Sequence, residues 1–113
     1  MLVAILPFIA DEEDPGAIVA TLLAPLPPGS YLVASHITPE HDPESMRGME
    51  DTYRAGGMTL QTRTAEDFGR IVFSGLELVP PGVVLVSEWR PAENGPRPKP
   101  AEVNGYGAVA RKP

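Results

Sequence analysis

The sequence contains no cysteine, and this absence excludes several kinds of chemistry at once. Without cysteine there can be no disulfide framework, no thiolate ligand for a metal and no thiol nucleophile. The two histidines, His36 and His41, are too few to form a convincing zinc site by themselves. We therefore expect neither a disulfide nor a metal site.

Positive charge is also scarce. Nine Lys and Arg residues stand against fifteen Asp and Glu residues, which gives a formal net charge of −6. The basic residues are scattered along the chain, whereas a surface that binds nucleic acid needs them clustered. The composition therefore argues against a nucleic-acid partner.

No hydrophobic run is long enough to span a membrane. The first apolar stretch, "LVAILPFI" at Leu2–Ile9, is far shorter than the roughly 20 residues that a spanning helix needs. No Lys or Arg precedes it and acidic residues follow it, so it does not resemble a signal peptide. We expect a cytoplasmic protein. The run shows no polar alternation, which predicts a buried strand of a parallel sheet.

Proline and capping residues mark three expected helices. Asp14 and Pro15 fit the N-cap and first position of a helix that continues to about Pro25. Asp42 and Pro43 repeat this arrangement and predict a helix over Pro43–Ala55, ended by Gly56 and Gly57. A capping-box pattern, with Asp67 three positions after Thr64, predicts a third helix that stops near Gly75.

The remaining apolar segments predict strands. Tyr31–Ser35 is short and apolar, Leu76–Val86 reads as a strand broken or bent at its prolines, and Tyr106–Arg111 reads as a last strand. The segment "RPAENGPRPKPAEVN" between the last two predicts a polar, exposed loop. The predicted order is β-α-β-α-α-β-β, within one domain.

Several of these segments together resemble one large bacterial family of S-adenosylmethionine-dependent methyltransferases. They are "LVAILPFIADEEDPGAIVATLLAPLPPGSYLVASH", "FSGLELVPPGVV", "EWRP" and "YGAVARKP", in that order. The resemblance implies an α/β fold, the C-terminal part of a seven-stranded Rossmann-like sheet. Leu2–Leu6 would be the fourth strand, Tyr31–Ser35 the fifth, Leu76–Val86 the sixth and Tyr106–Arg111 the seventh. Two parallel strands with a crossover helix would thus precede an antiparallel pair.

The resemblance covers only the C-terminal half of that family's domain. The part that should carry the glycine-rich cofactor loop has no counterpart here, and the nearest glycine cluster, Gly56–Gly57, follows a helix rather than a strand. Residues 1–113 are therefore expected to be a single partial domain, beginning within the fourth strand and inactive by itself.

Candidate site residues lie where the parallel strands end, since ligands bind beyond the carboxyl ends of such strands. The resemblance implies that Leu6, Pro7 and Phe8 line the methyl-donor end of the S-adenosylmethionine pocket. His36 is a candidate substrate contact or general base, with a structural histidine bonded to a nearby carbonyl as the alternative.

Other residues allow two readings. Met49 and Tyr53, with Met46, either line a substrate pocket or pack in the core. His41 and the acidic run Asp11–Asp14 are expected to be solvated, with Asp14 used as a cap. Trp89 and Arg90 have no derivable role beyond a stacked structural corner.

Two functions remain open at this point. The first is a fragment of an S-adenosylmethionine-dependent methyltransferase that acts on an unknown small acceptor. The second is a non-catalytic α/β interaction module that forms a homo-oligomer through an exposed sheet edge.

Overall fold

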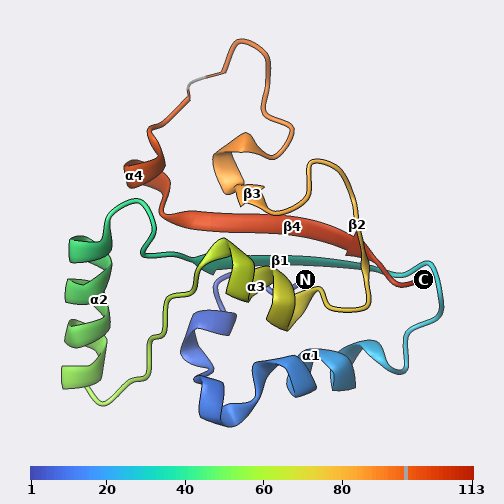
Figure 1. The fold of residues 1–113 in the computed structure, drawn as a ribbon, viewed down its shortest axis with the longest axis horizontal. Coiled ribbons are helices and arrows are strands. Elements are labelled where there is room, and N and C mark those ends of the chain that lie inside the picture. The colour runs from blue at the N-terminus through green and yellow to red at the C-terminus, as the bar shows by residue number, and fades with distance from the viewer. Residues whose placement is uncertain (96) are drawn as a thin grey trace.

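A four-stranded sheet forms the centre of the computed structural model, which describes residues 1–95 and 97–113 (Figure 1). The strands β1 (Tyr31–Ile37) and β4 (Gly105–Arg111) pair antiparallel along their full length. Two short strands, β2 (Glu77–Leu78) and β3 (Val84–Leu85), pair antiparallel with β4. The fold is therefore mixed α/β with a largely antiparallel sheet.

The prediction of a strand at the start of the chain is wrong except at Leu2. Leu2 forms a single parallel bridge with Ala34, in which its N–H donates to the Val33 carbonyl at 2.7 Å. Ala4 then takes a left-handed conformation with φ of 59°, and the 3-10 helix η1 follows at Leu6–Phe8. Because a strand cannot continue through a left-handed residue, the apolar run Leu2–Ile9 turns away from the sheet.

The three predicted helices are confirmed. They are α1 (Pro15–Leu23), α2 (Pro43–Ala55) and α3 (Ala65–Val72). The side chains of Asp14, Asp42 and Thr64 each accept a hydrogen bond from a backbone N–H of the first turn, as expected for N-caps. The third helix ends earlier than predicted, at Val72, and Gly75 lies in the turn that follows with φ of 78°.

The C-terminal segments agree with the prediction in most respects. The expected strand Leu76–Val86 is divided by its prolines into β2 and β3, and the 3-10 helix η3 (Val86–Glu88) follows. Arg90 stacks on Trp89, with its guanidinium carbon 4.6 Å from the ring centroid. The expected loop contains a short helix that was not predicted, α4 (Pro100–Val103), and residue 96 of that loop lies outside the described residues.

One face of the sheet carries the core. Alternate side chains of a strand point to opposite faces, and one set from β1 and β4 packs against α1 and α3. The main contributors are Leu32, Ala34, Ala108 and Ala110 from the sheet with Val19, Phe68 and Val72 from the helices. The molecule measures only 18 Å along its shortest axis, as expected for two layers.

The opposite face of the sheet is apolar, and among the described residues only the short 3-10 helix η3 lies against it. Its residues include Val33 and Val109, which with Val3, Val86 and Trp89 line a groove of about 550 Å³. We call this surface the open face. It is the main apolar surface of the sheet that the described residues leave without a covering layer.

Helix α2 stands at the end of the sheet where β1 ends and β4 begins (Figure 1). Met46 on α2 and Leu60 beyond it are buried. The Glu50 carboxylate accepts hydrogen bonds from the backbone N–H and the hydroxyl of Thr62, which ties the helix to the segment before α3. Within residues 1–95 and 97–113 no helix combines the length and apolarity that crossing a membrane requires.

Candidate functional site

The candidate site lies at the end of the sheet where the chain leaves Leu2 and β1. Residues 6–11 and 37–38 emerge there, and residues 60–63 cross beside them. The N–H of Gln61 donates to the Pro7 carbonyl at 2.8 Å, and the N–H of Arg63 donates to the Ile37 carbonyl at 3.1 Å. We call these three segments the rim. In α/β folds this is the end of the sheet at which ligands bind.

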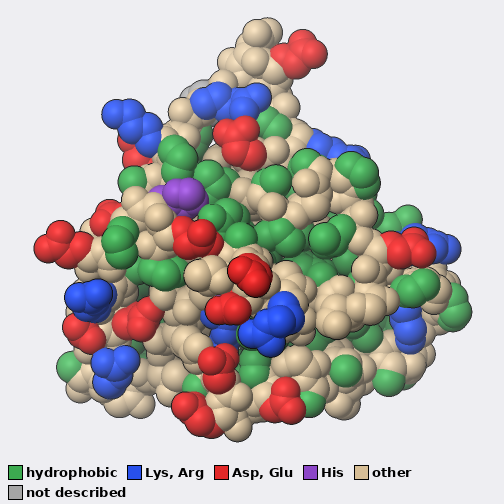
Figure 2. Space-filling view, in the orientation of Figure 1, with side chains coloured by type: hydrophobic (Ala, Val, Ile, Leu, Met, Phe, Trp, Pro, Cys, Tyr) green, Lys and Arg blue, Asp and Glu red, His purple; other side chains and the backbone are tan. Residues whose placement is uncertain are grey.

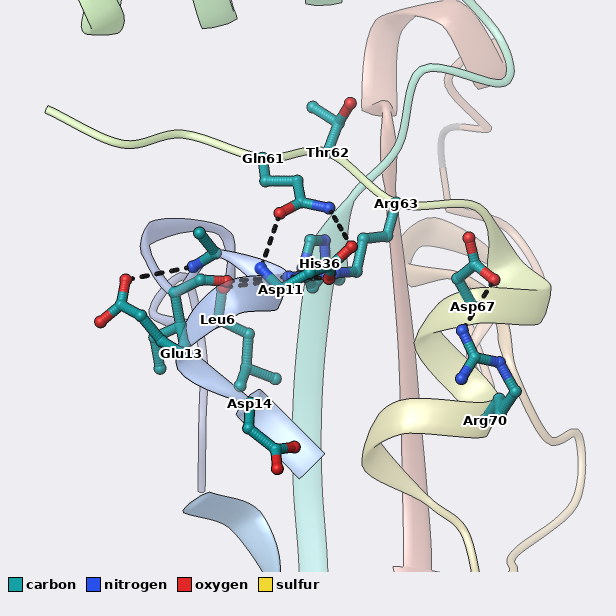
Figure 3. Close-up of polar contacts among 12 residues, drawn as sticks. Leu6, Asp11, Glu13, Asp14, His36, Gln61, Thr62, Arg63, Asp67 and Arg70 are labelled. Carbon is teal, nitrogen blue, oxygen red and sulfur yellow. Dashed lines mark hydrogen bonds and ion pairs between the residues drawn. The ribbon is translucent and has the colours of Figure 1, made fainter. Parts of the chain in front are cut away.

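Arg63 is at the centre of the rim (Figure 3). Its side chain is only 3% exposed, yet all five of its N–H donors have acceptors. Nη1 donates to the Leu6 carbonyl at 3.3 Å, and Nη2 donates to the Ile9 carbonyl at 2.8 Å. The guanidinium therefore fixes the backbone on both sides of Pro7 and Phe8.

Asp11 supplies the charge that Arg63 requires. Its Oδ1 accepts from Nη2 of Arg63 at 2.9 Å and from Nε at 3.3 Å, while Oδ2 accepts from the Gln61 amide at 2.9 Å. These hydrogen bonds, from Gln61 first and Arg63 second, hold the pKa of the Asp11 carboxyl below its usual value. Asp11 therefore stays ionised against Arg63. Its side chain is 62% exposed, so it is solvated as expected and is paired with Arg63 as well.

His36 completes the group, which we call the Arg63 cluster (Arg63, Asp11, Gln61 and His36). Its Nδ1 lies 2.8 Å from the Ile37 carbonyl, and its Nε2 lies 2.8 Å from Nη1 of Arg63. A carbonyl can only accept and a guanidinium can only donate, so Nδ1 carries the proton and Nε2 is the acceptor. Both ring nitrogens are thus occupied within the protein.

The predicted role of His36 as substrate contact or general base is not supported by this geometry. The residue is 2% exposed and packs against the Phe68 ring. Burial, with the nearby charge of Arg63, lowers the pKa of His36 to about 4, although the bond to Ile37 opposes this shift. The alternative reading, a structural histidine bonded to a nearby carbonyl, fits the structure. The side chain fixes Arg63 rather than facing a ligand.

The residues predicted to line a cofactor pocket are divided between core and surface. Leu6 belongs to the hydrophobic core and Pro7 is also buried. Phe8 is 39% exposed, and its ring lies 5.9 Å from that of Tyr53 in a tilted arrangement. The sequence thus identified two residues, Phe8 and Tyr53, that the fold brings into contact.

The three α2 residues, Met46, Met49 and Tyr53, are divided between core packing and a surface that a ligand can reach. Met46 is buried, as a core residue would be, whereas Met49 and Tyr53 are 38% and 36% exposed. Both exposed side chains lie one helical turn apart on the same side of α2. They remain candidates for contact with a ligand.

A second polar group at this end of the sheet was not predicted. The Tyr106 hydroxyl lies 3.1 Å from Nε2 of His41, and burial together with the charge of Glu40 raises the pKa of Tyr106. Glu40 also accepts a hydrogen bond from the N–H of Ala65 at 2.6 Å, at the start of α3. His41 is thus more than a solvated loop residue, since it takes part in joining the loop after β1 to β4.

The acidic run has structural roles in the structure. Asp14 caps α1 and lies outside the Arg63 cluster, as does the exposed Asp67–Arg70 pair (Figure 3).

Among the residues that the structure describes, no group of three His, Asp or Glu side chains could hold a metal ion. Charged side chains of both signs are interspersed on the face shown in Figure 2.

Comparison with known proteins identifies the family. The whole chain, residues 1–113, matches the family described as S-adenosyl methyltransferase. The chain belongs to this family. No curated protein matches it.

Two solved bacterial structures are similar to the chain. A DUF574 family protein from Streptomyces avermitilis matches with a TM-score of 0.90 and 42% identity, over 99% of this chain and 43% of that one. A protein from Thermobifida fusca, provisionally described as a methyltransferase, matches with a TM-score of 0.80 and 28% identity, over 96% of this chain and 40% of that one. The chain therefore spans about two fifths of each structure's length.

The burial of His36 predicts an acid-sensitive fold. With a folded pKa of about 4 against an ordinary value of 6.5, the unfolded chain binds a proton between these pH values and the folded chain does not. Stability is therefore complete above pH 6.5 and falls by about 1–3 kcal/mol as the pH is lowered toward 4. NMR titration of the His36 ring and urea unfolding at several pH values measure this. The His41→Gln variant should show the same fall, and titration of His36 near pH 6.5 would contradict it.

The five bonds of Arg63 predict that lysine cannot replace it. Arg63→Lys should lower the free energy of unfolding by about 2–4 kcal/mol, because carbonyls of residues 6 and 9 lose their donors. Arg54 provides the matched control, since within the described residues its side chain forms just an exposed pair with Asp51. Arg54→Lys should change stability by less than about 0.5 kcal/mol. Equal effects of the two substitutions in urea unfolding would show that the buried cluster does not support the rim.

Proposed function

We propose that the chain forms the C-terminal part of a Rossmann-like, S-adenosylmethionine-dependent methyltransferase domain. Its topology supports this assignment, because Leu2 bridges β1 in parallel across α1, and β4 runs antiparallel between β1 and the short strands β2 and β3. In this proposal Leu2 marks the fourth strand, β1 is the fifth, β2 with β3 the sixth, and β4 the seventh. The length of the two similar structures also agrees with a partial domain.

We propose that the described residues supply only part of a site for S-adenosylmethionine. Such a cofactor is held by a glycine-rich turn between a strand and a helix, whereas Gly56 and Gly57 follow α2. The carbonyls of Leu6, Pro7 and Ile9 are already hydrogen-bonded within the rim. We therefore propose that the chain alone is inactive, and that Leu6, Pro7 and Phe8 would supply only one wall beside the methyl group.

The proposal rests on the rim, which Arg63 and its partners hold in place, in a chain that belongs to a methyltransferase family. Arg63 holds residues 6–11 in one conformation at the end of the sheet where ligands bind in α/β folds. Methyl transfer from a sulfonium depends mainly on the alignment of donor and acceptor, so a rigid wall is useful even without an acid or base. We propose Met49 and Tyr53 as contacts of a small-molecule acceptor.

Calorimetric titration with S-adenosylmethionine tests the proposal. The 113-residue chain, shown to be folded by circular dichroism, should give no binding. A chimera in which residues 1–113 replace the matching segment of the Streptomyces avermitilis protein should bind the cofactor as that protein does, because 42% identity and a TM-score of 0.90 predict a compatible fold. Micromolar binding by the chain alone, or its loss in a folded chimera, would contradict the proposal.

A second candidate function is supported by the open face. The chain could act as a non-catalytic interaction module that pairs with a second copy through the sheet edge at Leu2 and the adjoining open face. Val3 and Val86 are about half exposed there. The indole N–H of Trp89 is buried and lacks a hydrogen-bond partner among residues 1–95 and 97–113. An apolar edge and face of this kind favours association.

Sedimentation velocity distinguishes this candidate from the first. If the chain is a homodimeric module, it should sediment as a dimer at micromolar concentration. Val3→Glu should then convert it to a monomer, because a carboxylate would be buried in the interface. Met58→Glu is the control, since Met58 is equally exposed but lies beyond α2. A monomer at every concentration would exclude the homodimer.

A further inference from the structure

Four apolar side chains lie exposed beside the rim. Phe8 and Tyr53 are in ring contact, with centroids 5.9 Å apart and planes inclined by 57°. Met49 precedes Tyr53 by one turn of α2, and the N–H of Met58 donates to the Tyr53 carbonyl at 2.9 Å. Each side chain is more than a third exposed. We call Phe8, Met49, Tyr53 and Met58 the aromatic patch.

The patch is built on backbone that is held in place. Phe8 ends η1, where its N–H donates to the Ile5 carbonyl at 3.0 Å. The carbonyls of Leu6 and Ile9 on either side accept from Arg63, and the Pro7 carbonyl accepts from Gln61. A ring on a fixed backbone loses little conformational freedom when a ligand binds, which favours recognition by contact.

Charged groups beside the patch already have partners within the chain. Asp11 is paired with Arg63 on the side of Phe8. On α2, Glu50 accepts from Thr62, and Asp51 pairs with Arg54. A charged ligand would therefore compete with partners that these groups already hold, and it would lose hydration on binding. Apolar and aromatic contact is what the patch offers.

The Tyr53 hydroxyl, by contrast, is free to bind. This hydroxyl takes part in no hydrogen bond within the described part of the chain. The ring of Tyr53 itself is in contact with the ring of Phe8. A binding site of mainly apolar lining with one or two orienting polar groups is the usual arrangement for small molecules. The hydroxyl can orient a ligand whose ring lies against Phe8.

We propose that the aromatic patch binds an uncharged aromatic ring. This inference rests on the proposed function, in which the ring belongs to the methyl acceptor and Leu6–Phe8 lies beside the methyl donor. The rings of Phe8 and Tyr53 attract the edge or face of another ring through their quadrupoles, and methionine sulfur adds a favourable aromatic contact. Aliphatic and charged acceptors of the same size gain less from these groups.

NMR titration of the folded chain with indole, with methionine methyl groups labelled, tests the proposal. Indole should shift the Met49 and Met58 methyl signals with saturation at millimolar concentration or below, while cyclohexanol, benzoate and benzylammonium bind more weakly. Tyr53→Leu and Phe8→Leu should each weaken indole binding by about fivefold, as expected for the loss of one aromatic contact.

Tyr31 supplies the matched control. It is an exposed tyrosine at the opposite end of β1, away from the rim. Tyr31→Leu should leave indole binding unchanged, and circular dichroism verifies that each variant is folded. The proposal is overturned if indole shifts do not saturate, if Tyr31→Leu has the same effect as Tyr53→Leu, or if benzoate or benzylammonium binds more tightly than indole.

The outcome is separable from that of the proposed function. Indole titration requires no S-adenosylmethionine, so the ring specificity of the patch is measured whether or not the cofactor binds. If indole binds as expected and the chimera fails to bind the cofactor, the patch stands as an aromatic site and the methyltransferase assignment fails. If the chimera binds the cofactor and indole does not bind the patch, only the acceptor class is wrong.

Discussion

The buried guanidinium of Arg63 is the interaction on which the candidate site depends. A buried charge is costly unless it is paired and its hydrogen bonds are satisfied. Asp11 provides the opposite charge, and the carbonyls of Leu6 and Ile9 with Nε2 of His36 accept the remaining N–H groups. The arrangement therefore specifies one conformation for residues 6–11. As a result, the exposed Phe8 ring is attached to backbone that is held in one conformation.

Local chemistry made the helices predictable. Asp14 with Pro15, Asp42 with Pro43, and Thr64 with Asp67 determine where the chain begins a helix, and each cap is formed as expected. The first strand was not predictable in the same way, because the apolar run Leu2–Ile9 does not reveal the left-handed Ala4. Its apolar residues are shared between the core and the surface instead of continuing a strand.

The site was predicted only in part, for a similar reason. Phe8 and Tyr53 were identified from the resemblance and from helical spacing, and the fold brings them together. Arg63 and Gln61 lie in the polar segment before α3, where no periodicity or motif distinguishes them. Their importance arises from contacts with residues fifty or more positions away. His36 lies at the expected strand end, but Arg63 and the Ile37 carbonyl occupy both of its ring nitrogens, which fits the structural alternative.

The account is tested most directly by the protonation state of the His36 ring. Nitrogen-15 NMR of the folded chain at pH 7 distinguishes the two tautomers of a neutral imidazole. The geometry predicts a neutral ring with its proton on Nδ1 and an unprotonated Nε2 that accepts from Arg63. A proton on Nε2, or a charged ring at this pH, would mean that Arg63 does not occupy the rim as described. The fixed position of Phe8 would then lose its physical basis.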